Sequence, residues 1–278
     1  MDEADILAKA PPSVQFGIST LFHSLRAWCE QKPLFQYLNP EAQRGMPVNA
    51  TLGFDTPEKA AQKVKDLHRK GFRTFKLKVG KDIHAECDLI QHIKKNFPEV
   101  NIRLDANRAW DFRQAIENLK LLEHFAPEYC EEPLSNPDPE SLAQLRDNTE
   151  IPLAADESVR SPNDVQKLIS QKSVDVLILK PMLLGSVTII REITELAASH
   201  HIPCIFTSTL DAGIVRLLTA HLSAALGSPG YACGVATGSL FRQDVFSDEH
   251  FIIDGRLQLG TTSEPDRFFE SDPRRLNL

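Results

Sequence analysis

The stretch Asn101–Trp110, which reads NIRLDANRAW, decides the fold class that we predict for this chain. Its first half alternates between aliphatic and polar residues, as in a β-strand with one buried face. Successive side chains of a strand point to opposite faces, so Arg103, Asp105 and Asn107 share one face. The next segment, 112–125, has helical periodicity, so Asp105 lies where a strand gives way to a loop.

The same order of strand and helix recurs along most of the chain. We predict strands at Val48–Leu52, Thr74–Val79, Asn101–Asn107, Glu128–Glu132, Pro152–Asp156, Val174–Lys180 and Pro203–Ser208, with a weak last strand at Tyr231–Val235. Helices are predicted between them, at 57–70, 82–96, 112–125, 139–146, 162–170, 186–199 and 214–226. Strands that alternate with helices predict a parallel sheet, and VDVLIL at 174–179 is typical of a strand buried on both faces.

Two folds could contain such a sheet. An open doubly wound sheet usually carries a glycine-rich phosphate loop, and no such loop follows the first strands here. A closed barrel takes about 250 residues, and residues 47–240 are compact but sufficient for one. We therefore predict an α/β fold with a (β/α)8-type TIM barrel over residues 47–240. A helix within 11–32 and a connection at 33–46 precede it, and a hairpin at 251–259 follows it.

Composition excludes several classes of protein. The net charge of the 278 residues is −7, whereas a nucleic-acid-binding protein is expected to present a basic surface. The N-terminus lacks the basic start and apolar core of a secretory signal, and the most apolar stretch, Val174–Leu184, is too short to cross a bilayer. Five widely spaced cysteines without a CxxC pair favour reduced thiols. We predict a cytoplasmic protein with no nucleic-acid or membrane partner.

Five successive predicted strands end on ionisable residues, about 25 residues apart, which is the length of one strand–helix unit. These residues are Lys76 and Lys78, then Asp105, Glu131, Asp156 and Lys180. In a barrel, the carboxyl ends of the strands form the rim where active sites are built. A single acid at a strand end is often only the cap of the next helix. We expect that role for Glu132 and Glu157, which should face outward.

Three carboxylates buried in one place need a cation, because like charges repel and burial of each charge costs free energy. Mg²⁺ prefers oxygen ligands and keeps several waters, and Mn²⁺ is a possible substitute. A substrate carboxylate on the metal would have its α-carbon between Lys78 and Lys180. The metal would stabilise the enediolate that forms when the α-proton leaves. Lys76 lies on the same face as Lys78, and both it and the cation disfavour a charged Lys78, as a base requires.

These motifs resemble those of one family. KLK at 76–78, RLDANRAW at 103–110, EEP at 131–133, DES at 156–158 and KPMLLGS at 180–186 are similar to motifs of the enolase superfamily. Within it, they resemble those of the o-succinylbenzoate synthases of menaquinone biosynthesis. The resemblance covers nearly the whole chain from Pro12 onward. It implies that Asp105, Glu131 and Asp156 bind the metal.

The resemblance also implies a carbon–oxygen lyase of the hydro-lyase type. Lys78 would take the α-proton of 2-succinyl-6-hydroxy-2,4-cyclohexadiene-1-carboxylate and return it to the departing hydroxyl, a syn dehydration that gives 2-succinylbenzoate. Lys180 would stabilise the enediolate from the opposite face. The substrate contacts implied are Lys76, Arg103, Asn107, Thr207, Ser208 and Gly234. Asp211 stands where a glutamate is usual in the family, and Thr207 and Ser208 could instead be ordinary strand-end capping hydroxyls.

Members of the superfamily begin with strands of an α+β capping domain. By resemblance, residues 1–46 are a helical remnant and connection of that domain, and residues 241–278 return to it. We expect the N-terminal strands of the cap to be absent. Residues 1–278 alone should then have weak activity, because closure excludes water and completes a site, and an apolar interface should be left bare.

Two other functions stay open. An N-succinylamino acid racemase or dipeptide epimerase of the same superfamily would use Lys78 and Lys180 as a paired acid and base. A non-catalytic binding or scaffold protein with a degenerate cap is the alternative from another class, and the complete set of lysines and acids weighs against it. The expected partner is a small-molecule carboxylate, and the sequence does not decide between a monomer and a homodimer.

Overall fold

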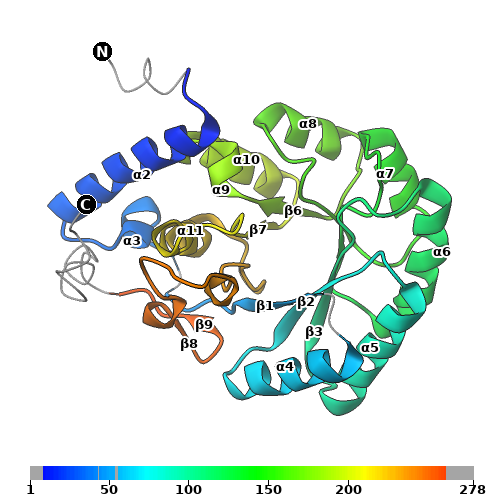
Figure 1. Cartoon of the computed structure of the whole chain (residues 1–278). Coiled ribbons are helices and arrows are strands. Elements are labelled where there is room, and N and C mark those ends of the chain that lie inside the picture. The colour runs from blue at the N-terminus through cyan, green and yellow to red at the C-terminus, as the bar shows by residue number, and fades with distance from the viewer. Residues whose placement is uncertain (1–8, 43, 54–55, 261–278) are drawn as a thin grey trace.

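A computed structural model describes residues 9–42, 44–53 and 56–260 (Figure 1). Seven parallel strands form one sheet in the order of the sequence. They are β1 (Asn49–Leu52), β2 (Thr74–Lys78), β3 (Asn101–Asp105), β4 (Cys130–Glu131), β5 (Leu153–Ala155), β6 (Val176–Leu179) and β7 (Cys204–Phe206). The helices between them are α4 (Pro57–Arg69), α5 (Ile83–Asn96), α6 (Phe112–Leu122), α7 (Pro139–Arg146), α8 (Pro162–Ser170), α10 (Val187–Ser199) and α11 (Gly213–Leu226). The sheet curls with these helices outside it, which is the arrangement of a (β/α)8-type barrel and confirms the predicted fold class.

The eighth position of the barrel is occupied by two residues rather than by a full strand. Cys233 forms a parallel bridge with Val48 next to β1, and Gly234 forms one with Thr207 next to β7. Four backbone hydrogen bonds of 2.8–3.0 Å flank these bridges. The predicted last strand at 231–235 is therefore too long. The two bridges nevertheless connect both edges of the sheet and close the barrel.

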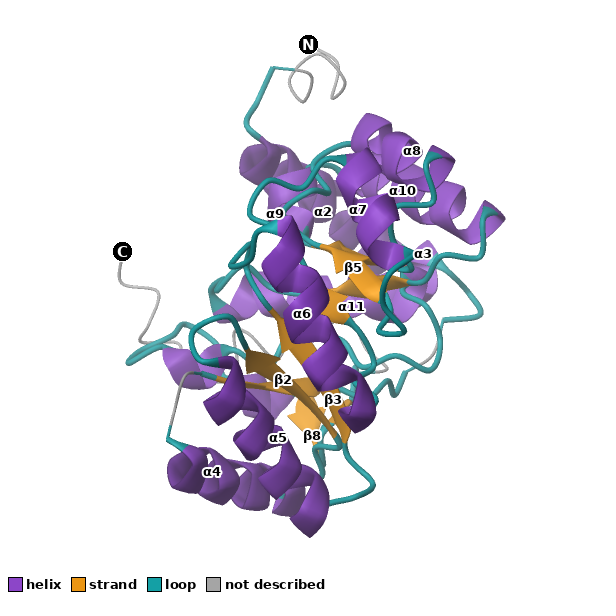
Figure 2. Cartoon of the chain, turned by 90° about the vertical axis from the view of Figure 1, so that its right-hand side faces the viewer, coloured by secondary structure: helices purple, strands orange, loops and turns teal. Residues whose placement is uncertain are grey.

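Six of the outer helices begin at a residue whose side chain accepts a hydrogen bond from the first helical turn. Thr56 accepts from the N–H of Lys59, and Asp111 forms a capping box with Gln114. The helices α5, α7, α8 and α10 are capped in the same way, by the side chains of Asp82, Asp138, Ser161 and Ser186. These caps define where each loop at the carboxyl rim ends and its helix begins. Figure 2 shows α4, α5 and α6 covering one side of the sheet.

Apolar side chains fill both sides of the sheet. The main core lies between the strands and the surrounding helices. A separate cluster inside the barrel consists of Tyr129, Ala154, Val176, Ile178 and Ile205. The guanidinium carbon of Arg103 lies 4.9 Å from the centre of the Tyr129 ring. The interior is thus a packed core, and the rim is the part of the barrel where a site can form.

Several shorter elements lie outside the alternating pattern. The helix predicted within 11–32 and the hairpin predicted at 251–259 are confirmed, but the stretch predicted as a connection contains a five-residue helix, and a four-residue helix follows β6. Helices of four or five residues are too short to show a periodicity in sequence. These elements are α2 (Pro12–Cys29), α3 (Leu34–Leu38), α9 (Pro181–Leu184), β8 (Ile252–Ile253), β9 (Arg256–Leu257) and the 3-10 turns η1 (Glu123–Phe125), η2 (Gly238–Leu240) and η3 (Asp248–His250).

One face of α2 presents large apolar side chains to solvent. Leu21, Leu25 and Trp28 are 57%, 48% and 55% exposed. Leu21 and Trp28 also line a groove of about 1870 Å³ between α2, α11 and the segment 238–250. Within the described ranges, no helix has the length and apolar character needed to span a membrane.

Candidate active site

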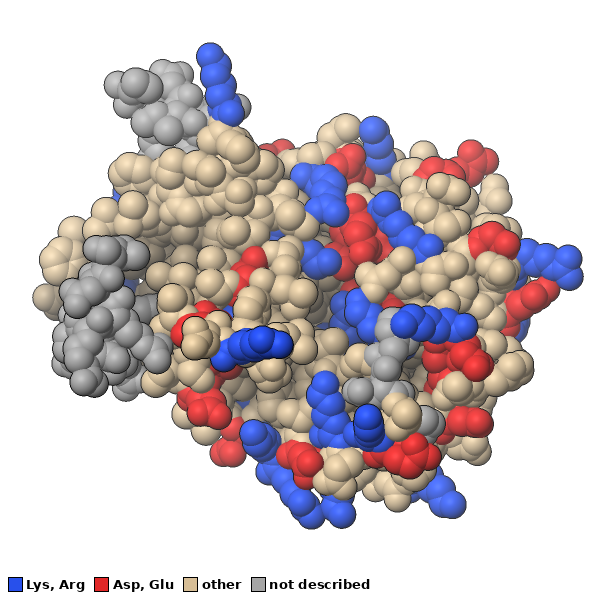
Figure 3. Space-filling view, viewed as in Figure 1, with Lys and Arg blue, Asp and Glu red and all other residues tan. Residues whose placement is uncertain are grey.

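The register of the sheet brings the strand-end lysines and acids to one rim. Lys78 on β2 pairs with Asp105 on β3, and Asp105 pairs with Glu131 on β4. Asp156 and Lys180 directly follow β5 and β6. Acidic and basic side chains lie next to one another near the centre of the view in Figure 3, over these strand ends. The structure thus brings these groups together, as the sequence predicted.

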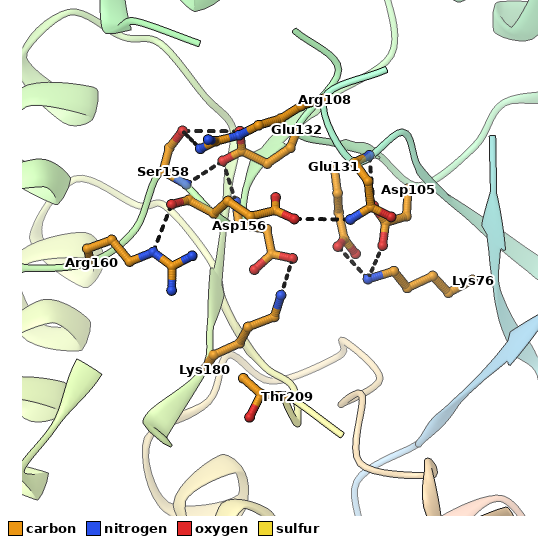
Figure 4. A network of polar contacts seen from close by, with 12 residues as sticks. Lys76, Asp105, Arg108, Glu131, Glu132, Asp156, Ser158, Arg160, Lys180 and Thr209 are labelled. Atoms are coloured by element: carbon orange, nitrogen blue, oxygen red, sulfur yellow. Dashed lines mark hydrogen bonds and ion pairs between the residues drawn. The ribbon is translucent and has the colours of Figure 1, made fainter. Parts of the chain in front are cut away.

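Lys76 lies between two carboxylates (Figure 4). Its Nζ is 2.5 Å from Oε2 of Glu131 and 2.7 Å from Oδ2 of Asp105. The Nζ of Lys78 is also 2.7 Å from Oδ2 of Asp105. Both carboxylate side chains are at most 2% exposed, so water screens these charges little. Lys76 therefore links β3 to β4 just inside the rim.

A further ion pair lies on the opposite side of the barrel. The Nζ of Lys180 is 2.5 Å from Oδ2 of Asp156, which is almost fully buried. The side chains of Lys78 and Lys180 are 28% and 20% exposed, against 13% for Lys76. Lys78 and Lys180 therefore reach the open side of the rim from two directions, whereas Lys76 is held further inside. A molecule that enters over the rim meets these two amines first.

Burial gives the three carboxylates different affinities for protons. It raises the pKa of Glu131 to about 7, although Lys76 opposes the shift. Burial acts in the same direction on Asp105, but attraction by Lys76 and Lys78 outweighs it and lowers the pKa of that carboxyl. Burial raises the pKa of Asp156. It would lower the pKa of Lys76, but the neighbouring carboxylates raise it well above its usual value. A metal cation that binds here competes with these protons.

The oxygens of the three carboxylates decide whether the site fits a metal ion. Among the residues that the structure describes, no group of three or more His, Cys, Asp or Glu side chains is arranged to hold a metal ion. Oε1 of Glu131 and Oδ1 of Asp156 are, however, buried and have no hydrogen-bond partner within the described ranges. The remaining oxygens of the cluster accept from lysines or, for Oδ1 of Asp105, from the N–H of Asn107 (3.1 Å). A buried carboxylate oxygen without a donor costs free energy, and a divalent cation that prefers oxygen would remove that cost. The chemistry of these oxygens therefore suits Mg²⁺, although the three side chains are not arranged around one common point in this structure.

Asn107 lies at the rim beside Lys78. Its Oδ1 accepts a hydrogen bond from the Nζ of Lys78, and its Nδ2 donates to Oε1 of Glu157 (3.0 Å). Its backbone is left-handed, with a φ of 44°, which asparagine tolerates better than most residues. The structure thus brings Asn107 into contact with the candidate base, and a contact with substrate stays a prediction.

Arg103 lies deeper in the barrel and is fully buried. Its Nε donates to Oε2 of Glu128 (2.5 Å), and its Nη1 donates to Oδ1 of Asn49 (3.0 Å) and to the carbonyl of Ala232 (2.7 Å). Its Nη2 is buried and has no hydrogen-bond partner among the described residues. These contacts give Arg103 a structural role inside the barrel, and its predicted contact with substrate stays a prediction.

The wall near β7 contains the predicted residues Thr207, Ser208 and Gly234. The hydroxyl oxygens of Ser208 and Thr237 are 2.8 Å apart. A Cβ at Gly234 would lie 2.7 Å from Cγ2 of Thr207, so the close approach of the two segments requires glycine. The next helix, α11, begins after Ala212 and has no side-chain cap, which argues against helix capping by either hydroxyl. Their contact with substrate stays a prediction.

Glu132 is buried and caps neither neighbouring helix, so the prediction of a surface or helix-capping group is wrong. Its φ of 40° turns the chain directly after Glu131, so the alternation of an extended strand does not apply to it. Its carboxylate accepts from the N–H groups of Asp156 (3.0 Å) and Ser158 (2.6 Å) and lies 3.3 Å from Nε of Arg108. Sequence reasoning missed this group of residues. The sequence held one sign of this group: in EEP (131–133) and DES (156–158), further polar residues directly follow each predicted metal ligand.

Comparisons with known proteins agree with this arrangement. A family model described as Enolase C-terminal domain-like matches residues 59–265. An o-succinylbenzoate synthase of Thermobifida fusca (strain YX) is 33% identical over 216 residues, which are 76% of this chain and 66% of that protein. An o-succinylbenzoate synthase of Mycobacterium tuberculosis (strain ATCC 25618 / H37Rv) is 32% identical over 266 residues, which are 91% of this chain and 77% of that protein.

A solved structure is also similar. The crystal structure of a dipeptide epimerase from Enterococcus faecalis V583, complexed with Mg and the dipeptide L-Leu-L-Tyr, matches with a TM-score of 0.82 and 25% identity. The match covers 93% of this chain and 73% of that chain. The chain spans just under two thirds of the length of the Thermobifida synthase, at 66%.

Proposed function

Because the chain belongs to the enolase superfamily, we propose that it is an o-succinylbenzoate synthase. The proposed reaction is the syn dehydration of 2-succinyl-6-hydroxy-2,4-cyclohexadiene-1-carboxylate to 2-succinylbenzoate, a step of menaquinone biosynthesis. Identities of 33% and 32% to two o-succinylbenzoate synthases support the proposal. The observation that carries it is the identity of 32% to the Mycobacterium synthase over 91% of this chain. The partly exposed Lys78 and Lys180, on opposite sides of three buried carboxylates, are the groups that the reaction needs.

Lys78 is the proposed base. Asp105 and the side-chain amide of Asn107 hold its amine at the open side of the rim. In the proposed reaction, Lys78 acts in its neutral form and takes the α-proton of the substrate. The bond between the ring carbon and the hydroxyl then breaks, and Lys78 returns the proton to the departing oxygen, which leaves as water. One lysine serves both steps because the proton and the hydroxyl leave from the same face.

Lys180 is the proposed electrostatic partner on the other face. It extends from the end of β6, four strands from the strand of Lys78, and its side chain is partly exposed. Its charge would stabilise the negative charge that develops on the substrate as the α-proton moves to Lys78. Thr207 and Ser208, at the end of β7, are the proposed contacts for the succinyl group.

Asp105, Glu131 and Asp156 are the proposed ligands of one Mg²⁺. When bound, the ion supplies positive charge beside the substrate carboxylate and so favours loss of the α-proton. Two of these side chains have buried oxygens without donors among the described residues, which supports the assignment. Mn²⁺ accepts similar oxygen ligands and is expected to substitute.

A racemase of N-succinylamino acids or a dipeptide epimerase is the second candidate. The dipeptide epimerase from Enterococcus faecalis, at 25% identity over 93% of this chain, favours it. So does the approach of Lys78 and Lys180 from two sides, since one amine could remove a proton and the other return it to the opposite face.

An assay with each substrate class decides between these candidates. The purified chain is incubated in D₂O with Mg²⁺ and with the cyclohexadiene substrate, an N-succinylamino acid or a dipeptide. We expect 2-succinylbenzoate to appear by absorbance and NMR, and expect its formation to stop with EDTA. Deuterium at the α-carbon of an N-succinylamino acid or dipeptide, without dehydration of the cyclohexadiene, would reverse the choice.

Removal of the proposed base tests the mechanism. We expect Lys78→Ala to lower kcat by about 10²- to 10⁴-fold, because the variant lacks the amine that moves the proton. Binding of Mg²⁺, measured by calorimetry, should persist in this variant because its three carboxylates remain. Lys65→Ala, at an exposed position of α4, is the control and should keep wild-type turnover. A wild-type protein that binds Mg²⁺ but turns over no substrate of any of the three classes would support the non-catalytic alternative.

A further inference from the structure

The carboxylate of Glu132 is buried beside the candidate metal ligands, and donors surround it (Figure 4). Its Oε1 accepts from the N–H of Asp156 at 3.0 Å and from the N–H of Ser158 at 2.6 Å. Its Oε2 accepts from the hydroxyl of Ser158 at 3.1 Å and from Nε of Arg108 at 3.3 Å. Both oxygens are thus fully used, as a buried carboxylate requires.

These donors come from the loops after β3 and β5, on either side of the loop that carries Glu132. Glu132 directly follows Glu131 at the end of β4, and Asp156, at the end of β5, donates its own N–H. Arg108 belongs to the loop after β3, three residues beyond Asp105, and its backbone N–H donates to the carbonyl of Glu132 at 2.7 Å. One residue therefore contacts the loops next to all three candidate metal ligands.

Ordinary helix capping does not explain this arrangement. The helix after β4, α7, is capped by Asp138, and the helix after β5, α8, is capped by Ser161. Glu132 itself adopts a left-handed φ of 40°, which is unfavourable for a residue with a Cβ. The strained backbone and the buried charge both cost free energy, and no helix start depends on them.

We propose that Glu132 is a positioning residue for the metal site. By holding the loops after β3, β4 and β5 together, it keeps Asp105, Glu131 and Asp156 near one another, so that one cation can bind all three carboxylates. Its loss should therefore weaken binding of a divalent cation. The inference rests on the proposed function to the extent that these three carboxylates are the ligands, but it does not depend on which substrate the protein takes.

Calorimetric titration of the full chain with MgCl₂, without substrate, tests the inference. We expect Glu132→Ala to raise the Kd for Mg²⁺ by about 10- to 100-fold, the range seen when residues that orient metal ligands are removed. Glu132→Gln should raise it less. Its one remaining oxygen can still accept from the N–H groups of Asp156 and Ser158, while its amide cannot accept from Arg108. If the alanine variant fails to fold, the glutamine variant and Ser158→Ala decide the question.

Glu123→Ala is the matched control. Glu123, in η1, also accepts from a backbone N–H, that of Glu150 (2.9 Å), from a hydroxyl, that of Thr149 (3.2 Å), and from Lys120. It lies before β4, at the other end of the barrel. We expect its loss to lower the Tm measured in EDTA while the Kd for Mg²⁺ stays unchanged. A purely structural role for Glu132 would give this same result.

The outcomes separate the two proposals. An unchanged Kd in both Glu132→Gln and Glu132→Ala would overturn the positioning role and leave the proposed function standing. Weakened Mg²⁺ binding in these variants, together with no turnover of the cyclohexadiene by the wild type, would support the positioning role and overturn the proposed function. A wild-type chain that binds no Mg²⁺ would overturn both.

Discussion

Lys76 has its ammonium nitrogen within 2.7 Å of two carboxylates that water scarcely reaches. Asp105 and Glu131 would otherwise lie next to each other with little to offset their repulsion. The same carboxylates are the proposed metal ligands, so Lys76 supplies positive charge where a cation would also supply it. At the scale of single residues, this lysine supports the metal-free form of the cluster.

Replacement of this lysine should destabilise the metal-free protein. We expect Lys76→Ala to lower the free energy of unfolding in EDTA by about 3–5 kcal/mol, because two buried carboxylates lose their ion-pair partner. Saturating Mg²⁺ should recover part of that loss, since a cation bound to the native state stabilises it. Urea denaturation with EDTA and with Mg²⁺ measures both quantities, and Lys65→Ala on the exposed side of α4 is the control. An equal loss in both conditions would contradict the prediction.

Burial should also control the reactivity of the cysteines. It raises the pKa of Cys204 to about 12 and that of Cys233 to about 11, so almost no reactive thiolate is present at pH 8. Cys130 is also buried, with a pKa raised well above its usual value, whereas Cys29 is exposed.

A disulfide exchange reagent at pH 8 should therefore modify Cys29 rapidly and the half-buried Cys87 more slowly. The three buried thiols should react only after unfolding. Spectrophotometric titration of released thiolate, with and without denaturant, counts the two classes. Cys29→Ser should abolish the rapid phase. Reaction of more than two thiols in the folded protein would show that burial does not protect them.

The residues of the site were predictable where the backbone is extended. The end of each predicted strand correctly placed Asp105 and Asp156 at the rim, and the two-residue period of the strand gave the face of their side chains. That period failed at Glu132, because a left-handed residue directly after the strand breaks the alternation, and its side chain is buried against the neighbouring loops. Such a turn leaves no periodic trace in the sequence, since its stability comes from donors on two other loops. Side-chain partners that are distant in sequence are likewise not visible in a strand pattern.

At the scale of elements, the hairpin of β8 and β9 packs against the turn that ends α4. Gly71 has a φ of 87°, and a Cβ there would lie 2.3 Å from the carbonyl carbon and oxygen of Asp254. Gly255, with a φ of 65°, meets the backbone of Gly71 in the same way. The two glycines therefore permit a backbone contact that larger residues would prevent.

Two glycine substitutions separate the stability lost to an unfavourable backbone conformation from the stability lost to a steric clash. Gly230 has a φ of 88°, but a Cβ there would have no neighbouring atom within 4 Å, so Gly230→Ala should cost about 1–2 kcal/mol from conformation alone. Gly71→Ala should cost about 1–3 kcal/mol more, because the hairpin must also shift. Urea denaturation midpoints at equal slope measure both losses. Equal losses would mean that the hairpin moves away freely.

The elements themselves were largely predictable, and their lengths were less so. The strand predicted at 101–107 ends at Asp105, and the strand predicted at 128–132 is reduced to Cys130–Glu131. A strand ends where its ladder partner ends, and that length depends on the neighbouring strands rather than on its own residues. The helix starts were more reliable because a capping side chain such as Asp111 acts within its own first turn.

At the scale of the whole molecule, α2 leaves an apolar face exposed beside a groove. Leu25 and Trp28 are each about half exposed, and they lie on α2, which packs against α9, α3 and α10. A contiguous apolar surface of this kind usually binds apolar molecules.

This face should bind the dye ANS. We expect the folded protein to enhance ANS fluorescence, and expect the double variant Leu25→Lys and Trp28→Lys to remove most of the enhancement. Leu121→Lys, at an exposed apolar position of α6, should leave the fluorescence unchanged. The comparison is made at equal protein concentration, with circular dichroism to confirm that each variant is folded. Equal dye binding by the double variant would place the apolar surface elsewhere.

The cluster at the rim contains three ammonium groups and three carboxylates in contact, so their formal charges cancel when all six are ionised. Entry of a divalent ion would then leave an excess of two positive charges at the rim, or of one when Lys78 is the neutral base. An anionic ligand would offset this excess, whereas a zwitterionic dipeptide would not. Electrostatic balance therefore favours anions among the small molecules that this protein could accept, and affinity for them should weaken as ionic strength rises.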